Sequence, residues 1–490
     1  MNAPPAQQRR FPVSRPAAEL RLAAERMLAR AAGAPLVAGN SVRILRDAAE
    51  NYPAWLSAIA AARRSVLFEN YLIADDATGR RFAEALAERA RAGVVVRVIY
   101  DWMGGLGIGS SRLLLPLAEA GVEVRCFNPP RLDSPFGWMT RDHRKMVAVD
   151  GETGFVSGLC IDQRWEGDAR RGVPPWRDTG IEIRGPAVAD IVQAFAQTWT
   201  ACGGQAADAS ASPPPAPAGE VALRVLATQP SLAGLYRMDQ MIAALARETL
   251  WLTDAYFVGI PTYVQALRAA ARDGVDVRLL VPGASDLPMV GGISRAGYRP
   301  LLEAGIRVFE WNGSMLHAKT AVADSRWARV GSTNLNLASW IGNYELDVAF
   351  EDQGCATRMQ EIYEEDLGNA TEILLGPRQQ VRRVQKVPAR PGGRSGRGGR
   401  AARAAADALR IGNTVGAAFS SWRILGPAEA GMMSGVALGF LLLALLAVMV
   451  PLAVTLPMAL LALWIGVTLL VRAWHLRRGS EDDDQDGSAQ

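Results

Sequence analysis

Cysteine, histidine and lysine are scarce in this sequence. Its 490 residues include four cysteines, three histidines and three lysines, whereas arginine supplies 50 of the 53 lysine and arginine residues. The cysteines show neither paired nor metal-ligand spacing, which argues against a disulfide framework or a zinc site and fits a reducing compartment. Segment 1–15 is polar and has no apolar stretch, so we expect no cleavable signal peptide.

Charge is absent from a long segment near the C-terminus. From Gly431 to Val471, 41 consecutive residues carry no charged side chain, about twice the roughly 20 residues that cross a bilayer. Pro451 and Pro457 interrupt this run near its middle, where they would end one helix and begin another. We therefore expect a hairpin of two transmembrane helices within 429–473. Arginines on both sides of the run predict that both of its ends are cytoplasmic.

The body of the chain contains an internal repeat. The segment from Ala62 to Asp101 is similar to that from Ala246 to Ser285, and a shorter pair of similar segments follows each of them. In both copies, short β-branched runs alternate with alanine- and leucine-rich segments of helical period. This alternation indicates two α/β lobes with largely parallel sheets.

Composition divides the rest of the chain. A segment rich in proline, alanine and serine separates the two repeats, and one rich in arginine and glycine follows the second. The latter could bind an anionic membrane surface or nucleic acid, or simply remain solvated. The expected parts are an N-terminal extension (1–40), a first lobe (41–206), a linker (207–220), a second lobe (221–378), a basic flexible tether (379–428), two transmembrane helices (429–473) and an acidic tail (474–490).

The scarce residues concentrate in two motifs. Two of the three histidines and two of the three lysines belong to the pattern His-x-Lys-x4-Asp, once as His143, Lys145 and Asp150 and once as His317, Lys319 and Asp324. Because arginine is used almost everywhere else, lysine at these places indicates a need for a compact ammonium group. Two copies at corresponding places of a repeat favour a shared active site over structural histidines.

The spacing of the motifs indicates phosphate chemistry. Both lie in strand-like runs, where a period of two places histidine and lysine on one face, so that both can reach the same phosphate. After the second motif, Ser332 and Asn334 are candidate hydrogen-bond donors to the phosphate oxygens. In the first copy the matching stretch is 157–160, where Gly158 is a candidate substrate-binding residue and Cys160 stands in the place of Asn334.

These residues carry a resemblance to the phospholipase D superfamily, whose signature is His-x-Lys-x4-Asp followed six residues later by Gly-Ser-x-Asn. The second motif matches it throughout, whereas the first departs at Ser157 and Cys160. From about Val42 to Phe350 the chain is most similar to bacterial cardiolipin synthases. The resemblance implies two pseudo-symmetric α/β lobes, each with a mixed sheet flanked by helices, and an active site at their interface.

The resemblance also implies a mechanism without a metal or another cofactor. One imidazole attacks phosphorus to form a phosphohistidine, and the other transfers the proton of the alcohol. By this analogy His143 is the nucleophile and His317 the acid/base, and the two lysines offset charge on the phosphate.

Four carboxylates receive supporting roles by the same analogy. Asp178 and Glu345 lie in segments that resemble those whose carboxylate orients a histidine in this family. Asp150 and Asp324 belong to the catalytic motifs, but they lie five residues beyond their lysines and are expected to brace the lobes.

The leading functional hypothesis is phosphatidyl transfer that makes cardiolipin from phosphatidylglycerol or a related donor, at the cytoplasmic face of a bacterial inner membrane. A hydrolytic phospholipase D, which releases phosphatidic acid, would use the same residues. A nuclease of the same superfamily is less favoured because the basic residues gather in the tether, so no nucleic-acid partner is expected. A non-catalytic lipid-binding or scaffold protein is disfavoured by the retention of both His-Lys pairs. The sequence leaves the oligomeric state and the identity of the acceptor open.

Overall fold

The computed structural model describes residues 25–131, 139–205, 214–375 and 381–383, together with twelve scattered residues between 438 and 467. Most of the expected transmembrane hairpin, and almost all of the expected tether, therefore lie outside the described residues. In the described part of the chain, no helix is both long enough and apolar enough to cross a bilayer. The expected boundaries of the extension, linker, tether and tail remain predictions.

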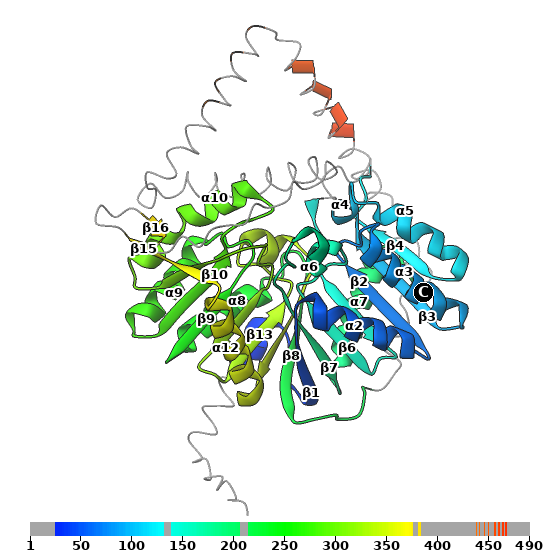
Figure 1. Cartoon of the computed structure of the whole chain (residues 1–490), viewed down its shortest axis with the longest axis horizontal. Helices are drawn as coiled ribbons and strands as arrows, with labels where there is room; N and C mark the ends of the chain where they lie inside the picture. Colours follow the sequence, from blue (N-terminus) through cyan, green and yellow to red (C-terminus); the bar gives the residue numbers. More distant parts are fainter. Residues whose placement is uncertain are drawn as a thin grey trace, which may run out of the picture.

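Two lobes of similar construction lie side by side (Figure 1). The strands of the first lobe are β1 (Val37–Arg46), β2 (Ser65–Asn70), β3 (Val95–Asp101), β4 (Glu123–Phe127), β5 (Lys145–Val149), β6 (Thr153–Ser157) and β7 (Thr179–Arg184). Its helices are α2 (Asp47–Ala61), α3 (Ala77–Arg91), α4 (Trp102–Gly105), α5 (Ser110–Leu114), α6 (Gln163–Glu166) and α7 (Val188–Ala201), with 3-10 turns η1 (Leu115–Ala120) and η3 (Ala169–Arg171).

The second lobe repeats this order. Its strands are β8 (Val221–Thr228), β9 (Thr249–Thr253), β10 (Asp276–Pro282), β11 (Arg307–Trp311), β12 (Thr320–Ala323), β13 (Trp327–Gly331), β14 (Glu345–Glu351), β15 (Ala370–Leu375) and β16 (Val381–Arg383). Its helices are α8 (Gly234–Leu245), α9 (Pro261–Arg272), α10 (Pro288–Ala296), α11 (Tyr298–Leu302) and α12 (Gln353–Leu367), with a π-helical turn, η5 (Ala338–Gly342).

All described strands join one sheet, in which the strands of the two lobes follow the same order outward from the β1-β8 pair and β15 and β16 extend the second lobe. The order is β16-β15-β11-β10-β9-β12-β13-β14-β8-β1-β7-β6-β5-β2-β3-β4, so antiparallel pairing of β1 with β8 joins the lobes. Within each lobe, parallel pairing is confined to β2-β3-β4 and to β9-β10-β11. The sheets are therefore mixed, as the family resemblance implied. The expectation of largely parallel sheets was wrong because hairpins follow the alternating strand-helix half of each repeat.

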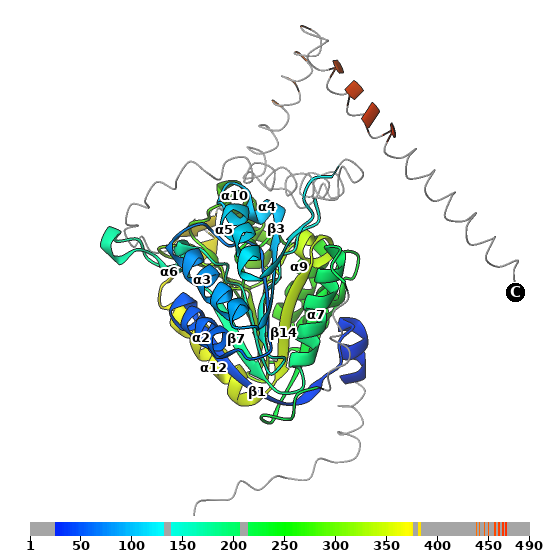
Figure 2. The same cartoon turned by 90° about the vertical axis from the view of Figure 1, so that its right-hand side faces the viewer.

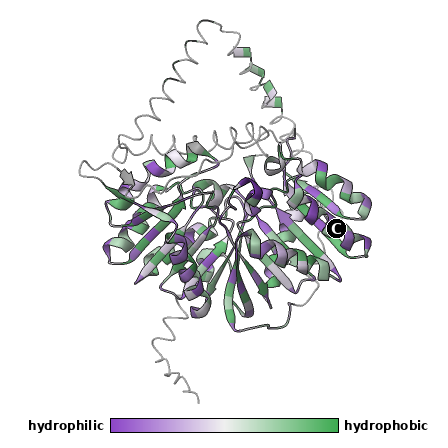
Figure 3. Cartoon of the chain, in the orientation of Figure 1, coloured by the Kyte–Doolittle hydropathy of each residue, from purple (hydrophilic) through white to green (hydrophobic). Residues whose placement is uncertain are grey.

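Helices cover both faces of each half of the sheet (Figures 1 and 2). In the first lobe, α2 and α3 pack on one face and α7 on the other, because alternate residues of β2 to β6 belong to two separate apolar clusters. In the second lobe, α8 and α9 oppose α12 in the same manner. Apolar residues run along the central strands (Figure 3). One cluster includes residues of both lobes, among them Ile181 and Val348, so the lobes share a core.

The corresponding helices α3 and α9 begin differently but are followed by equivalent glycines. Asp76 caps α3 by accepting a hydrogen bond from the Gly79 N–H, whereas α9 begins with Pro261, which tolerates the first helical turn. After each helix the chain turns through a glycine of positive φ, Gly93 at 86° and Gly274 at 95°, a conformation that disfavours other residues. These turns lead the chain from each helix into the next parallel strand, β3 in the first lobe and β10 in the second.

Candidate active site

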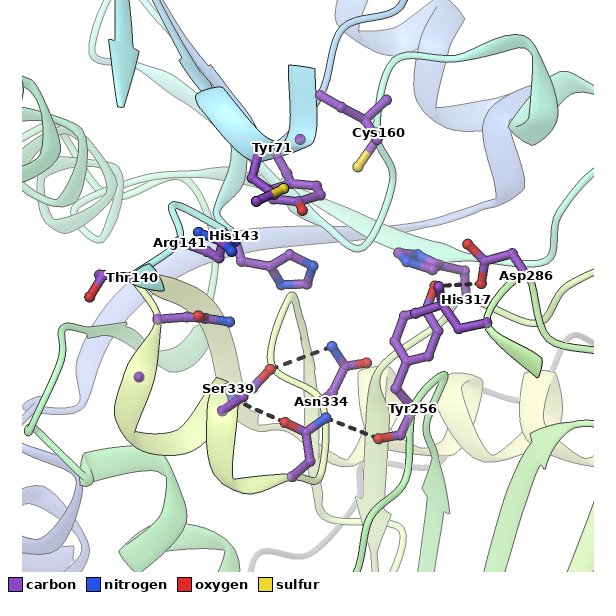
Figure 4. Close-up of a pocket in the computed structure, with 18 of the residues that line it drawn as sticks. Tyr71, Thr140, Arg141, His143, Cys160, Tyr256, Asp286, His317, Asn334 and Ser339 are labelled. Carbon is purple, nitrogen blue, oxygen red and sulfur yellow. Dashed lines mark hydrogen bonds between the residues drawn. The ribbon is translucent and has the colours of Figure 1, made fainter. Parts of the chain in front are cut away.

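The two motif histidines lie on the wall of one cavity. His143 lies two residues before β5 and His317 three residues before β12, one in each lobe. Both line a cavity of about 470 Å³ between the lobes, and Figure 4 shows their imidazoles on either side of its centre. The lobes thus bring together two side chains that are 174 positions apart in the chain.

Each histidine is oriented by a carboxylate from the opposite lobe. His143 Nδ1 lies 2.9 Å from Glu345 Oε2, and His317 Nδ1 lies 2.8 Å from Asp178 Oδ2. Both carboxylates are fully buried. With Nδ1 bonded to a carboxylate, the other ring nitrogen, Nε2, is the one left for chemistry in the cavity. The sequence indicated both carboxylates but not this exchange between the lobes.

Backbone hydrogen bonds hold the exchanged segments in place. The His143 N–H donates to the Tyr344 carbonyl at 2.9 Å, and the His317 N–H donates to the Arg177 carbonyl at 2.7 Å. The Tyr344 N–H in turn donates to the Arg141 carbonyl at 2.8 Å. Each histidine is therefore pinned through its main chain to the residue that precedes its orienting carboxylate, so ring and carboxylate are positioned by the same contact.

The two motif lysines lie beneath the histidines and are almost fully buried. Lys319 Nζ lies 2.9 Å from His317 Nδ1 and 3.1 Å from Nε2, and it also donates to the His317 carbonyl. Lys145 Nζ donates to the His143 carbonyl at 2.5 Å. Burial lowers the pKa of Lys319 to about 8, which still leaves most of this amine protonated at neutral pH. Neither lysine is among the residues that line the cavity, so each places its positive charge behind the cavity wall, next to its histidine.

The two orienting carboxylates differ in acidity. Burial raises the pKa of Glu345 to about 7, against the opposing charge of Lys145. Burial would also raise the pKa of Asp178, but its hydrogen bond to His317, the charge of Lys319 and the indole N–H of Trp165 outweigh it and hold the pKa below its usual value. Asp178 is therefore ionised at neutral pH, whereas Glu345 titrates there.

Asp150 and Asp324, the last residues of the two motifs, do not line the cavity. The Asp150 carboxylate accepts backbone N–H bonds from Arg63, Arg64 and Ser65, and Asp324 accepts those of the three corresponding residues, 247–249. Both aspartates adopt positive φ at the end of their strand. They join the hairpin to the start of the neighbouring strand, and this geometry supports the bracing role.

Of the three predicted substrate-binding residues, only Asn334 lines the cavity. The Ser332 hydroxyl donates to Glu345 Oε2 at 2.6 Å, so its proton is directed to the carboxylate. A Cβ atom added to Gly158 would lie 2.2 Å from Asp178 Oδ1, so glycine there allows Asp178 to approach its histidine. Ser332 and Gly158 thus position the carboxylates rather than contact the cavity. Cys160 lines the cavity opposite Asn334 (Figure 4).

Several wall residues were not identified from the sequence. Tyr71 packs against His143 at 5.2 Å between ring centroids, and Tyr256 packs against His317 at 5.8 Å. The two tyrosines occupy equivalent positions of the internal repeat, and this recurrence could have identified them from the sequence. Three other wall residues, Trp165, Arg164 and Asp286, have no obvious partner in the repeat, and only the folded chain brings them to the site.

A scan against protein families matches residues 55–199 and 240–367 to a family described as cardiolipin synthase, PLD-like domain. The two matched ranges fall in the two lobes. Cardiolipin synthase A of Pseudomonas aeruginosa (strain LESB58) is 35% identical over 368 residues, which cover 73% of each chain. Cardiolipin synthase of Alkalihalophilus pseudofirmus is 30% identical over 69% of this chain and 68% of its own.

Among solved structures, phosphatidylserine synthase of Haemophilus influenzae Rd KW20 superposes with a TM-score of 0.55 at 15% identity, over 74% of this chain and 92% of that one. This likeness concerns the fold. The family model and the sequence relatives confirm the family indicated by the twin motifs. The chain belongs to the cardiolipin synthase family of the phospholipase D superfamily.

Proposed function

We propose that this protein is a phosphatidyltransferase that makes cardiolipin and glycerol from two molecules of phosphatidylglycerol, or from a related donor, through a phosphohistidine intermediate. The observation that carries the proposal is the pair of imidazoles on one cavity wall, each bonded through Nδ1 to a buried carboxylate. The names of the sequence relatives support the same reaction.

In the first step, His143 Nε2 attacks the phosphorus of the donor while the bond from phosphorus to the glycerol oxygen breaks. His317 gives its proton to that oxygen, and glycerol leaves. In the second step, His317 takes the proton of a hydroxyl on the second phosphatidylglycerol. That oxygen attacks phosphorus, the bond from phosphorus to His143 breaks, and cardiolipin is released.

The electrostatics of the site support these roles. Burial and the charge of Lys319 lower the pKa of His317 to about 3, and an anionic phosphodiester between the histidines acts in the opposite direction by stabilising the imidazolium. His317 would then be protonated mainly when a substrate is bound. The Lys145 and Lys319 ammonium groups would offset charge on the non-bridging oxygens, where stabilisation of the transition state is most effective.

Apolar side chains support a lipid substrate. The part of the cavity wall that belongs to the first lobe is mostly apolar, and Leu106, Met139 and Ile341 line the cavity while remaining 36–40% exposed. These three residues come from separate segments, so a bilayer could cover them together. Acyl chains of the donor would leave the cavity along this rim.

A membrane anchor in the C-terminal segment is part of the proposal. In its described part, the leucine, methionine and valine side chains are 51–71% exposed, for example Leu441 and Met449. Together with the uncharged run from Gly431 to Val471, they suit a lipid environment better than water. We place the catalytic lobes at the cytoplasmic face of a bacterial inner membrane, with the basic tether against its anionic lipids.

The test is to incubate the detergent-purified full chain with phosphatidylglycerol vesicles and to separate the lipid products, alongside His143→Ala and His317→Ala. Cardiolipin and glycerol in equal amounts, absent with either variant, are expected. Phosphatidic acid as the main product would instead identify a hydrolase, which shares every residue of the site. Cleavage of DNA without lipid turnover would refute both and identify a nuclease.

A further inference from the structure

The cavity wall around His317 carries a carboxylate that the reaction above does not use. Asp286 lies in the loop between β10 and α10 and lines the cavity beside Tyr256 and His317 (Figure 4). The Tyr256 hydroxyl donates to Asp286 Oδ1 at 2.8 Å, while the Tyr256 ring packs against the His317 ring. A single tyrosine thus links this carboxylate to the proposed acid/base.

The position of Asp286 is fixed by its neighbours. Leu287, the next residue, belongs to a buried apolar cluster with Tyr256, Val290 and Met315. Because both ends of the Tyr256–Asp286 hydrogen bond are anchored in this cluster, the carboxylate is held in place before any substrate arrives.

A guanidinium group completes this part of the wall. Arg164 binds Asp162 through two hydrogen bonds of 2.9 and 2.8 Å and lies over the Trp176 ring at 4.8 Å from its centroid. Trp176 in turn packs against His317, with 5.8 Å between centroids. Arg164 also interacts electrostatically with Asp286. Carboxylate, guanidinium and aromatic ring are a combination suited to a polar headgroup with hydroxyl groups.

The opposite part of the wall is unsuited to such a group. Leu72, Met103, Leu106, Ile108 and Met139 form an apolar part of the wall, whereas Asp286 and Arg164 lie in the polar part beside His317. In both steps of the proposed reaction a glycerol unit lies beside His317, first as the leaving alcohol and then as the incoming one. The polar wall is therefore in the place where a glycerol unit has to bind.

We propose that Asp286 accepts a hydrogen bond from the secondary hydroxyl of the glycerol unit whose primary hydroxyl reacts at phosphorus. This inference rests on the proposed function and on His317 as the acid/base. Asp286 then selects alcohols with a second hydroxyl over simple alcohols and water.

Competition between two soluble alcohols tests this selection. The full chain is supplied with phosphatidylglycerol vesicles and equal concentrations of deuterated glycerol and 1-propanol, and mass spectrometry measures deuterated phosphatidylglycerol against phosphatidylpropanol. Both products arise from the same phosphatidyl-enzyme, so their ratio does not depend on how fast that intermediate forms. Wild-type protein is expected to favour glycerol. Asp286→Asn is expected to lower the ratio by about tenfold, since a charge-assisted hydrogen bond is replaced by a weaker one.

Two further variants make the result specific. Tyr256→Phe removes the hydroxyl that holds Asp286 and should lower the ratio by a smaller factor, whereas Asp273→Asn alters an exposed carboxylate outside the cavity and should leave it unchanged. An unchanged ratio in both Asp286→Asn and Tyr256→Phe would overturn the inference. So would a stronger preference for ethanolamine than for glycerol that Asp286→Asn abolishes, because the subsite would then bind an ammonium group. If wild-type protein forms neither of these products nor cardiolipin, the proposed phosphatidyl transfer itself is refuted. Cardiolipin without deuterated phosphatidylglycerol would leave that transfer intact and overturn the inference that this subsite selects a glycerol unit.

Discussion

Replacing Asp150 with alanine is expected to destabilise the first lobe while leaving the turnover of the folded protein nearly unchanged. The change removes the acceptor of three backbone N–H bonds, of 2.9, 2.7 and 2.8 Å, from Arg63, Arg64 and Ser65. It also places alanine at a φ of 55°, where a side chain without a local hydrogen bond costs about 1 kcal/mol. Water can solvate the exposed N–H groups of Arg63 and Arg64, and in part that of Ser65, so the loss of their acceptor is partly offset. We therefore expect a total loss of about 3 kcal/mol.

Thermal denaturation and lipid turnover should be measured on the same preparation. Because the two lobes share one sheet and one core, a loss of that size lowers the melting temperature by about 4 °C. Glu152→Ala is the matched control, since its carboxylate is 67% exposed and pairs with Arg64, and its removal should change the stability by less than about 0.5 kcal/mol. Loss of turnover by Asp150→Ala with an unchanged melting temperature would refute the bracing role.

The pH dependence gives a second criterion for the same variant. Partial burial acts to raise the pKa of Asp150, but its backbone N–H bonds and Arg64 outweigh this effect and hold the pKa below its usual value. Because the pKa of Asp150 is lower in the folded state, its ionised side chain stabilises the fold at pH values above its pKa in the unfolded chain, which is about 4. This stabilisation is lost as the pH falls through the pKa of Asp150 in the folded protein. The difference in stability between the wild type and Asp150→Ala should therefore shrink below about pH 4.

Three further predictions concern the cavity. Glu345→Gln should lower turnover by about 100-fold yet stabilise the fold at pH 8 by about 1–3 kcal/mol relative to wild type, because a carboxylate whose pKa is raised to about 7 is costly to ionise. Denaturant titrations of both proteins at pH 5 and pH 8 measure this difference in the free energy of unfolding. The double variant His143→Ala/His317→Ala should be no slower than the slower single variant, as expected for two residues that act as a unit; independent, multiplying losses would contradict this. Cys160 should react slowly with N-ethylmaleimide at pH 7, because burial raises the pKa of its thiol, and bound phosphatidylglycerol should slow the reaction further. Mass spectrometry measures the labelling, with Cys160→Ala as the control. Fast labelling that lipid does not affect would contradict this prediction.

The sequence allowed much of the fold and the centre of the site to be predicted. Scarcity of histidine and lysine singled out the four motif residues, because a chain that otherwise uses arginine has no packing reason to place lysine there. The repeat predicted two lobes, and the equivalent strands do follow the same order in each. Both features are visible in the linear sequence, because the motifs and the repeat are made of residues that lie close together along the chain.

Features that depend on how the lobes meet could not be predicted in this way. Linear order does not show that Glu345 serves the histidine of the first lobe, because this pairing arises only when β1 joins β8 and the lobes share a core. Ser332 matched the expected pattern of a phosphate donor, but a buried carboxylate 2.6 Å away takes its hydrogen bond. Asp286 lies in a loop without a counterpart in the repeat, so no internal comparison pointed to it.

The exchange of carboxylates between the lobes has a consequence for any attempt to divide this protein. An isolated N-terminal half would keep His143 but lose Glu345, and an isolated C-terminal half would keep His317 but lose Asp178. Neither fragment could orient its own imidazole, and co-expression would restore turnover only to the extent that the fragments reassemble. By the same reasoning, a single-copy ancestor would have needed two molecules to build one reaction centre, and gene fusion would have made that partnership independent of concentration.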